Sequence, residues 1–165
     1  MNVILIGMPG VGKSTIGVLL AKALGYSFVD TDLIIQSETG MKLSDILAEK
    51  GAEGFSEIEN DVLWNLDADK AVIATGGSAV LCEKGMRRLT ESGTTVYLFL
   101  PPEELEKRLG NIKTRGVVMR EGETIADLAA ERAPYYEKYA DVTIRETGGI
   151  EDTVKAVLDA LGTDR

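Results

Sequence analysis

The 165-residue chain contains no histidine, so histidine-based acid–base catalysis and histidine metal sites are excluded. Its one cysteine, Cys82, cannot form a disulfide within the chain, which agrees with a reducing compartment. No apolar run approaches the roughly 18 residues that cross a bilayer, and a strand pattern starts at Asn2, leaving no room for a signal peptide. These absences favour a cytoplasmic protein without a membrane partner.

Positive charge is also scarce. The chain has 18 lysines and arginines against 27 acidic residues, for a net charge of −9. A general nucleic-acid surface needs clustered basic residues, so we expect no nucleic-acid partner. The length suits one compact domain over residues 1–165, and the absence of an obvious exposed apolar stripe favours a monomer.

The most informative motif present is a phosphate-binding loop. Residues Gly7–Thr15 match the pattern G-x-x-x-x-G-K-[ST] between an apolar strand pattern and a helical one. In such a loop backbone N–H groups surround a phosphate, Lys13 reaches the β- and γ-phosphates, and the Ser14 hydroxyl ligates Mg²⁺. We therefore expect ATP and Mg²⁺ as cofactors, with the nucleotide held by Gly10, Val11, Gly12, Lys13, Ser14 and Thr15.

Apolar strand patterns alternate with helical patterns along the chain, which predicts an α/β fold with helices on both faces of a parallel sheet. Strands are predicted at Asn2–Ile6, Ser27–Val29, Ala71–Ala74, Thr94–Leu100 and Asp141–Ile144. Helices are predicted at Lys13–Leu24, Asp32–Glu38, Lys42–Lys50, Ala52–Leu66, Cys82–Glu91, Pro102–Leu109, Thr124–Lys138 and Ile150–Leu161. Ligands of such sheets bind beyond the carboxyl ends of the strands.

Asp30 and Asp32 follow the second predicted strand. Asp30 is placed to join the Mg²⁺ environment, and Asp32 to orient a substrate hydroxyl or act as a weak base. The alternative for Asp32 is an N-cap of the helix that follows, and the two roles are compatible.

Two further segments carry candidate residues. Gly76 and Gly77 follow the third strand, where glycine lets a ligand approach the backbone, although a plain turn explains them too. The glycine-rich, basic segment at 110–123 reads either as a linker or as a lid that brings Arg115 to the phosphates. Arg132 follows in the next helix and can point back at the substrate.

Taken in order, these motifs resemble those of the shikimate kinases, from Val3 to about Leu161. The resemblance rests on the phosphate loop, Asp30-Thr31-Asp32, Gly51-Ala52-Glu53-Gly54-Phe55, Ala74-Thr75-Gly76-Gly77, the lid arginine and Glu131-Arg132-x-Pro-x-Tyr. It implies a P-loop NTPase three-layer sandwich with a five-stranded parallel sheet in the order 2-3-1-4-5.

The same resemblance implies roles for individual residues. Asp32 binds the ring hydroxyls of shikimate, Gly77 contacts it through its backbone, and Arg132 grips its carboxylate. Arg115 reaches the phosphates and Asp30 belongs to the Mg²⁺ environment. At the nucleotide, Arg108 packs on adenine, and the loop Thr147-Gly148-Gly149 lies nearby.

Three positions depart from the family pattern. The family arginine before x-x-Glu59 is Ser56, the usual third glycine is Ser78, and the lid Arg-Pro is Arg115-Gly116. The arginine normally forms half of the carboxylate clamp, so its loss weakens binding unless another arginine, such as Arg120, fills the gap.

We therefore expect an ATP-dependent kinase that phosphorylates a small-molecule hydroxyl, with shikimate as the first acceptor to test. A kinase for a different polyol or hydroxy acid is the alternative, because a serine hydroxyl cannot neutralise a carboxylate. A nucleotide-binding regulatory protein is a third possibility, against which the intact Lys13, Asp32 and Arg115 argue.

Overall fold

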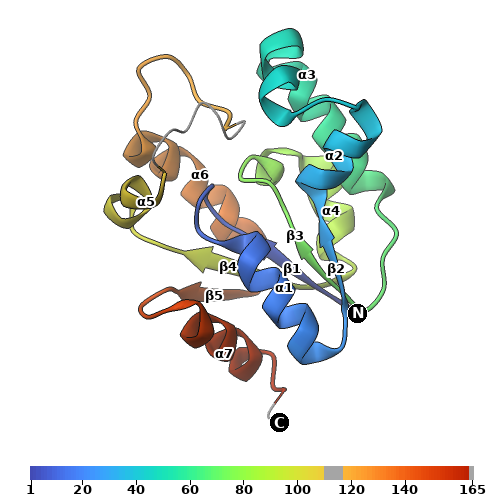
Figure 1. Ribbon diagram of the computed structural model, residues 1–165, viewed down its shortest axis with the longest axis vertical. Helices are drawn as coiled ribbons and strands as arrows, with labels where there is room; N and C mark the ends of the chain where they lie inside the picture. Colours follow the sequence, from blue (N-terminus) through green and yellow to red (C-terminus); the bar gives the residue numbers. More distant parts are fainter. Residues whose placement is uncertain (110–116, 164–165) are drawn as a thin grey trace.

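The computed structural model describes residues 1–109 and 117–163, which form a parallel sheet between layers of helices (Figure 1). The sheet contains β1 (Asn2–Ile6), β2 (Ser27–Asp30), β3 (Ala71–Ala74), β4 (Gly93–Phe99) and β5 (Val142–Arg145). The helices are α1 (Lys13–Leu24), α2 (Thr31–Thr39), α3 (Leu43–Asn65), η1 (Ala79–Leu81), α4 (Glu83–Thr90), α5 (Pro102–Arg108), α6 (Ile125–Tyr139) and α7 (Ile150–Ala160). The strand order β2-β3-β1-β4-β5 confirms the predicted one.

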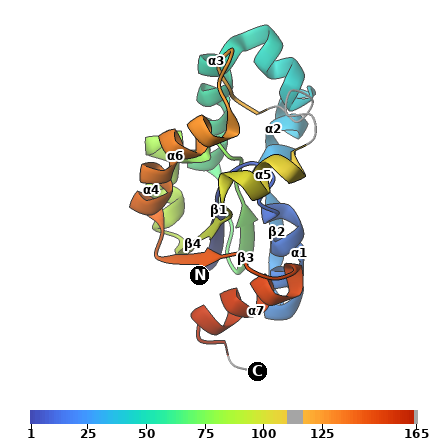
Figure 2. The ribbon, with the colours of Figure 1, turned by 90° about the vertical axis from the view of Figure 1, so that its left-hand side faces the viewer.

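The central strand β1 pairs in parallel with both β3 and β4. All five of its residues are buried, because α1 and α7 cover one face of the sheet and α4 and α6 the other (Figure 2). A strand covered on both faces is expected to be continuously apolar, as Val3–Ile6 is. The main core forms around this strand.

The predicted helices at 42–50 and 52–66 follow one another in α3 and are separated by a kink at Gly51, whose φ of 69° and ψ of −177° are not helical. This conformation favours glycine, because a side chain there meets its own backbone. A second, smaller core of Ile35, Ile46, Phe55 and Val62 packs α2 against α3. It holds these two helices as a unit beside the carboxyl ends of the strands.

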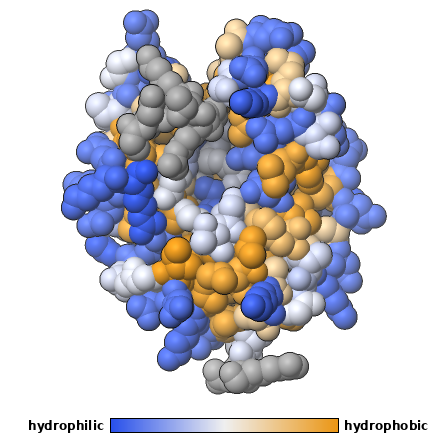
Figure 3. Space-filling view, in the orientation of Figure 1, coloured by the Kyte–Doolittle hydropathy of each residue, from blue (hydrophilic) through white to orange (hydrophobic). Residues whose placement is uncertain are grey.

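Across the sheet edge from α2 and α3 lie α5 and the start of α6 (Figure 1). The surface is hollowed between these two parts of the molecule (Figure 3). In the part of the chain that the structure describes, no helix is both long and apolar enough to cross a membrane.

Candidate active site

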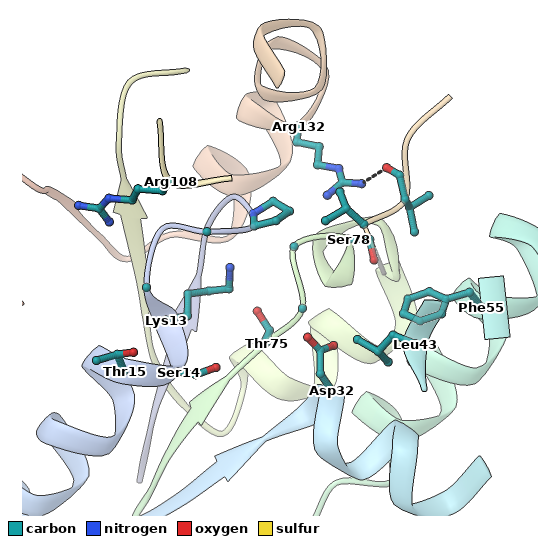
Figure 4. A pocket seen from close by; sticks show the side chains of 17 residues that line it. Lys13, Ser14, Thr15, Asp32, Leu43, Phe55, Thr75, Ser78, Arg108 and Arg132 are labelled. Carbon is teal, nitrogen blue, oxygen red and sulfur yellow. Dashed lines mark hydrogen bonds between the residues drawn. The ribbon is translucent and has the colours of Figure 1, made fainter. Parts of the chain in front are cut away.

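The hollow contains a cavity of about 450 Å³ beyond the carboxyl ends of β1, β2 and β3. Its lining brings the predicted nucleotide and acceptor residues together (Figure 4). The residues around it are Pro9, Gly10, Gly12, Lys13, Ser14, Thr15, Asp32, Leu43, Phe55, Thr75, Gly76, Gly77, Ser78, Arg108, Val117, Val118 and Arg132.

The phosphate loop runs from β1 to α1 with positive φ angles of 82° at Gly10 and 98° at Gly12. Gly12 is the N-cap of α1 and, lacking a side chain, makes no capping hydrogen bond. The first N–H groups of the helix are therefore left for another acceptor, and the helix dipole favours an anion there.

Lys13 is 7% exposed and points into the cavity (Figure 4). Its Nζ donates hydrogen bonds to the carbonyl oxygens of Gly7, at 2.7 Å, and Met8, at 3.0 Å. Burial lowers the pKa of Lys13 to about 8, although the nearby Asp32 carboxylate opposes this shift. The loop thus holds a buried ammonium group beside the open end of α1.

Ser14 and Asp30 lie together, with the Ser14 hydroxyl donating to Asp30 Oδ2 at 2.7 Å. Both groups offer hard oxygen atoms, which suit Mg²⁺. Among the described residues no group of three or more His, Cys, Asp or Glu side chains could hold a metal ion. A pair of this kind fits Mg²⁺, which keeps most of its ligands as water and phosphate oxygen.

The suggested capping role of Asp32 is wrong, because Asp30 caps α2. Strand β2 ends at Asp30, whose extended backbone, with φ −112° and ψ 114°, is typical of an N-cap. Its Oδ1 accepts a hydrogen bond from the Asp32 backbone N–H at 3.0 Å. The Asp32 side chain instead faces the cavity (Figure 4), where burial raises its pKa to about 6 and the charge of Asp30 adds to the shift.

The turn at Gly76 and Gly77 approaches several side chains closely. A Cβ on Gly76 would lie 2.7 Å from Glu59 Oε1 and 2.8 Å from Asp32 Oδ1. A Cβ on Gly77 would lie 2.6 Å from the ring of Pro9. Glycine therefore permits the close packing at both positions, which line the cavity.

Arg132 is 2% exposed and projects from α6 into the acceptor end (Figure 4). Its Nη2 donates to the carbonyl oxygen of Val118 at 3.0 Å, while its buried Nη1 has no hydrogen-bond partner among the described residues. A buried guanidinium with a free donor is well suited to bind an anionic group.

Arg108 lies at the opposite, nucleotide end. Its Nη1 donates to the Val11 carbonyl oxygen at 3.3 Å and pairs with Glu146 Oε2 at 3.0 Å. Glu146 immediately precedes the predicted loop Thr147-Gly148-Gly149, so this ion pair joins α5, the phosphate loop and the last loop. The ion pair between Arg108 and Glu146 was not predicted, because the two residues are far apart in the sequence.

Neither Ser56, which stands in place of the family arginine, nor Arg120, which was suggested to replace it, lines the cavity. Ser56 lines a neighbouring hollow, where its Oγ lies 3.8 Å from Cys82 Sγ. The suggestion that Arg120 replaces the missing arginine is wrong: its side chain is 82% exposed and its Nη2 lies 3.6 Å from Glu131 Oε1. Arg115 lies outside the described residues, and its role stays a prediction.

Ser78 lines the cavity and Glu59 lies beside it, and sequence reasoning assigned a role to neither. Glu59 is 1% exposed, and burial raises its pKa to about 7. Its Oε2 accepts a hydrogen bond from Ser78 Oγ at 2.7 Å. One sequence feature could have indicated a role for Glu59: this chain keeps the glutamate of the family pattern although it lacks the arginine three residues before it.

Comparisons with known proteins agree with this arrangement. The shikimate kinase family model matches residues 9–162. A shikimate kinase from Moorella thermoacetica is 39% identical over 164 residues, covering 96% of this chain and 95% of its own. The solved structure of an Acinetobacter baumannii shikimate kinase in complex with shikimate has a TM-score of 0.91 and 32% identity, covering 98% of this chain and 93% of that one.

A shikimate kinase structure from Aquifex aeolicus has a TM-score of 0.85 and 33% identity, covering 98% of this chain and 96% of that one. The similarity therefore extends over nearly the whole of the chain, in sequence and in structure. This chain belongs to the shikimate kinase family.

Proposed function

We propose that this protein is an ATP-dependent phosphotransferase that moves the γ-phosphoryl group of ATP to the 3-hydroxyl of shikimate. One observation carries the proposal: Lys13, Asp32 and Arg132 come from three separate helices and line the same cavity. Family membership supports ATP as the phosphoryl donor and shikimate as the acceptor.

The nucleotide end of the cavity holds the phosphates. The N–H groups at the start of α1 bind the phosphate oxygens, and Lys13 exchanges its hydrogen bonds to the loop carbonyls for bonds to phosphate. Ser14 and Asp30 would hold Mg²⁺, which neutralises phosphate charge when bound. The proposed packing of Arg108 on adenine and the proposed phosphate contact of Arg115 rest on the sequence resemblance.

The acceptor end positions the nucleophile. Arg132 binds the carboxylate of shikimate through its free Nη1, and the Gly76–Gly77 turn lets the ring approach the backbone. Asp32, ionised at neutral pH, accepts a hydrogen bond from the attacking hydroxyl. The hydroxyl oxygen then forms a bond to the γ-phosphorus while the bond between the γ-phosphorus and the β–γ bridging oxygen of ATP breaks, which releases ADP. The Asp32 carboxylate accepts the proton of the attacking hydroxyl.

A second candidate keeps this chemistry and changes the acceptor. It is favoured by Ser56, which carries no charge and lines the neighbouring hollow, so that Arg132 is the guanidinium at the acceptor end among the described residues. A neutral polyol, or a hydroxy acid of another shape, would place less demand on a single arginine.

A coupled assay of ADP release tests the proposal with Mg-ATP, shikimate and a panel of polyols and hydroxy acids. Saturable turnover on shikimate, absent from Lys13→Ala, is the expected result. Background hydrolysis with shikimate beside clear turnover on another compound would replace the acceptor. A cytoplasmic monomer remains a prediction from the sequence.

A further inference from the structure

One of the departures from the family pattern, Ser78, contacts the Glu59 carboxyl group, and a second, Ser56, lies one helical turn from Glu59. Ser56 and Glu59 are three residues apart on α3 and therefore share a face of the helix. Ser78 comes from the turn after β3, yet its hydroxyl donates to Glu59 Oε2 at 2.7 Å. A long side chain at position 56 would reach the same carboxyl group from its own helix.

Glu59 needs a hydrogen-bond donor because it is buried. It is 1% exposed, and its Oε1 has no hydrogen-bond partner within residues 1–109 and 117–163. A buried carboxylate without donors or a cation is strongly disfavoured. An arginine at position 56 would supply a positive charge and several N–H donors. Ser56 has no charge and a single hydroxyl, and this hydroxyl lies beside the Cys82 thiol, with 3.8 Å between Oγ and Sγ.

Ser78 is the strongest donor that Glu59 has among the described residues. The other side chain there that donates to this carboxylate is the Cys82 thiol, with 3.9 Å between Sγ and Oε2, and a thiol is a weak donor. Asp32 and Arg132 are the charged groups that also act on Glu59, with opposite signs.

The hydroxyl of Ser78 is not used for capping. Ser78 is the N-cap of η1, where a serine commonly accepts a hydrogen bond from the helix, but its side chain makes no such bond. The hydroxyl is turned toward α3 instead. Its use at this position is therefore the contact with Glu59.

The contact acts on the turn that lines the acceptor end. Glu59 Oε1 lies against Gly76, so close that a Cβ there would be 2.7 Å away. On the other side, the Tyr136 hydroxyl donates to the Gly77 carbonyl oxygen at 2.6 Å. The turn is thus tied to α3 through Ser78 and Glu59, and to α6 through Tyr136.

We propose that Ser78 holds Glu59 in this chain, where position 56 carries no arginine that could do so, and that it thereby positions the Gly76–Gly77 turn for the phosphoryl acceptor. Ser78 is a positioning residue, and this role rests on the proposed function of the cavity. The two departures from the family pattern compensate each other, so the effects of changing residues 56 and 78 are coupled.

A double-mutant cycle tests the coupling with Ser78→Ala and Ser56→Arg, alone and together. In the unmodified background, Ser78→Ala is expected to raise the KM for shikimate about tenfold and to leave the KM for ATP within twofold. In the Ser56→Arg background the same change is expected to cost less than twofold. Ser78→Thr, which keeps the hydroxyl, should retain the original KM, and Ser56→Ala is the matched control.

Equal losses from Ser78→Ala in both backgrounds would overturn the proposal, as would an equal rise in both KM values. Melting temperatures of the four proteins supply a readout that does not depend on the acceptor. If the unmodified protein fails to turn over shikimate, the proposed function is wrong. The coupling between residues 56 and 78 is then tested by the melting temperatures alone. Additive changes in melting temperature would then refute it.

Discussion

The Asp30 carboxylate caps α2 by accepting a hydrogen bond from the backbone N–H of Asp32 at 3.0 Å. The cap is provided by one aspartate, so the side chain of the other is left to face the cavity. The stability of the cap therefore does not depend on the Asp32 side chain. For this reason a substitution at Asp32 is a clean test of the acceptor site.

Asp32→Asn is expected to lower kcat/KM for shikimate by at least a hundredfold, because an amide neither takes a proton nor holds the hydroxyl as a carboxylate does. The melting temperature should hardly change, since the cap is intact. Steady-state kinetics and thermal unfolding check both statements, with the exposed Asp45→Asn on α3 as control. Activity near that of the control would remove Asp32 from the mechanism.

The pH dependence of kcat/KM should follow two buried groups. Burial raises the pKa of Asp32 to about 6, so activity falls about tenfold per pH unit as this group is protonated below that value. Burial lowers the pKa of Lys13 to about 8, so activity also falls above that pH as the ammonium is lost. A rate profile that is flat from pH 5 to 7 would contradict the assignment of Asp32.

Lys13→Ala is expected to reduce turnover by at least a thousandfold, because it removes the cation that neutralises charge on the transferring phosphoryl group. The variant should still fold, because the substitution removes an ammonium group that the unmodified protein has to bury. The ADP-release assay measures the effect, and Lys22→Ala, an exposed lysine on the same helix, is the control. Turnover within tenfold of the unmodified protein would refute phosphoryl transfer at this loop.

Arg132→Lys is expected to raise the KM for shikimate about a hundredfold and to spare the KM for ATP. A lysine keeps the charge, but it cannot both reach the Val118 carbonyl and present a second fixed donor to a carboxylate. Arg120→Lys, at a side chain that is 82% exposed, is the control and should have no effect. A neutral acceptor would instead show little dependence on Arg132, and such a result would favour the second candidate function.

Glu59→Gln is expected to stabilise the protein at pH 8. The folded-state pKa of Glu59 is about 7, above its ordinary 4.5, so between these values the folded state binds more protons than the unfolded one. The free energy of unfolding therefore falls as pH rises from 4.5 to 7 and levels off above, a loss on the order of 3 kcal/mol that glutamine avoids.

Urea unfolding at pH 5 and pH 8 measures this difference. The advantage of Glu59→Gln over the unmodified protein should be larger at pH 8 than at pH 5. The exposed Glu57→Gln on the same helix should show no such trend. An advantage that does not grow with pH would mean that Glu59 is held as a stable carboxylate.

Local patterns were sufficient to predict most of the fold and the nucleotide end of the site. Local sequence patterns predicted the strand β1, the phosphate loop and the helix α1, because the contacts that determine each of them lie within a few residues. The boundary between the helices predicted at 42–50 and 52–66 also falls at Gly51, where the structure has its kink. The 3₁₀ turn η1 was not predicted, because one short turn has no periodicity to detect.

The acceptor end was harder to predict, because its contacts join distant segments. Asp32 seemed suited to cap a helix until β2 proved to end at Asp30. Arg120 seemed able to fill a gap, but it lies at the surface beside Glu131. Neither outcome can be read from a single segment, since each depends on where a strand ends or which way a helix faces.

The sequence by itself determined that this chain binds a nucleoside triphosphate in a parallel α/β fold, because glycine conformation, a lysine and a hydroxyl at fixed spacing carry that chemistry locally. Only the tertiary structure decided that the Ser78 hydroxyl donates to Glu59, that Asp30 caps α2 and that Arg132 Nη1 is buried without a partner among the described residues. The physical reason is burial: a side chain's partner, its charge state and its free hydrogen bonds depend on which distant residues exclude water from it.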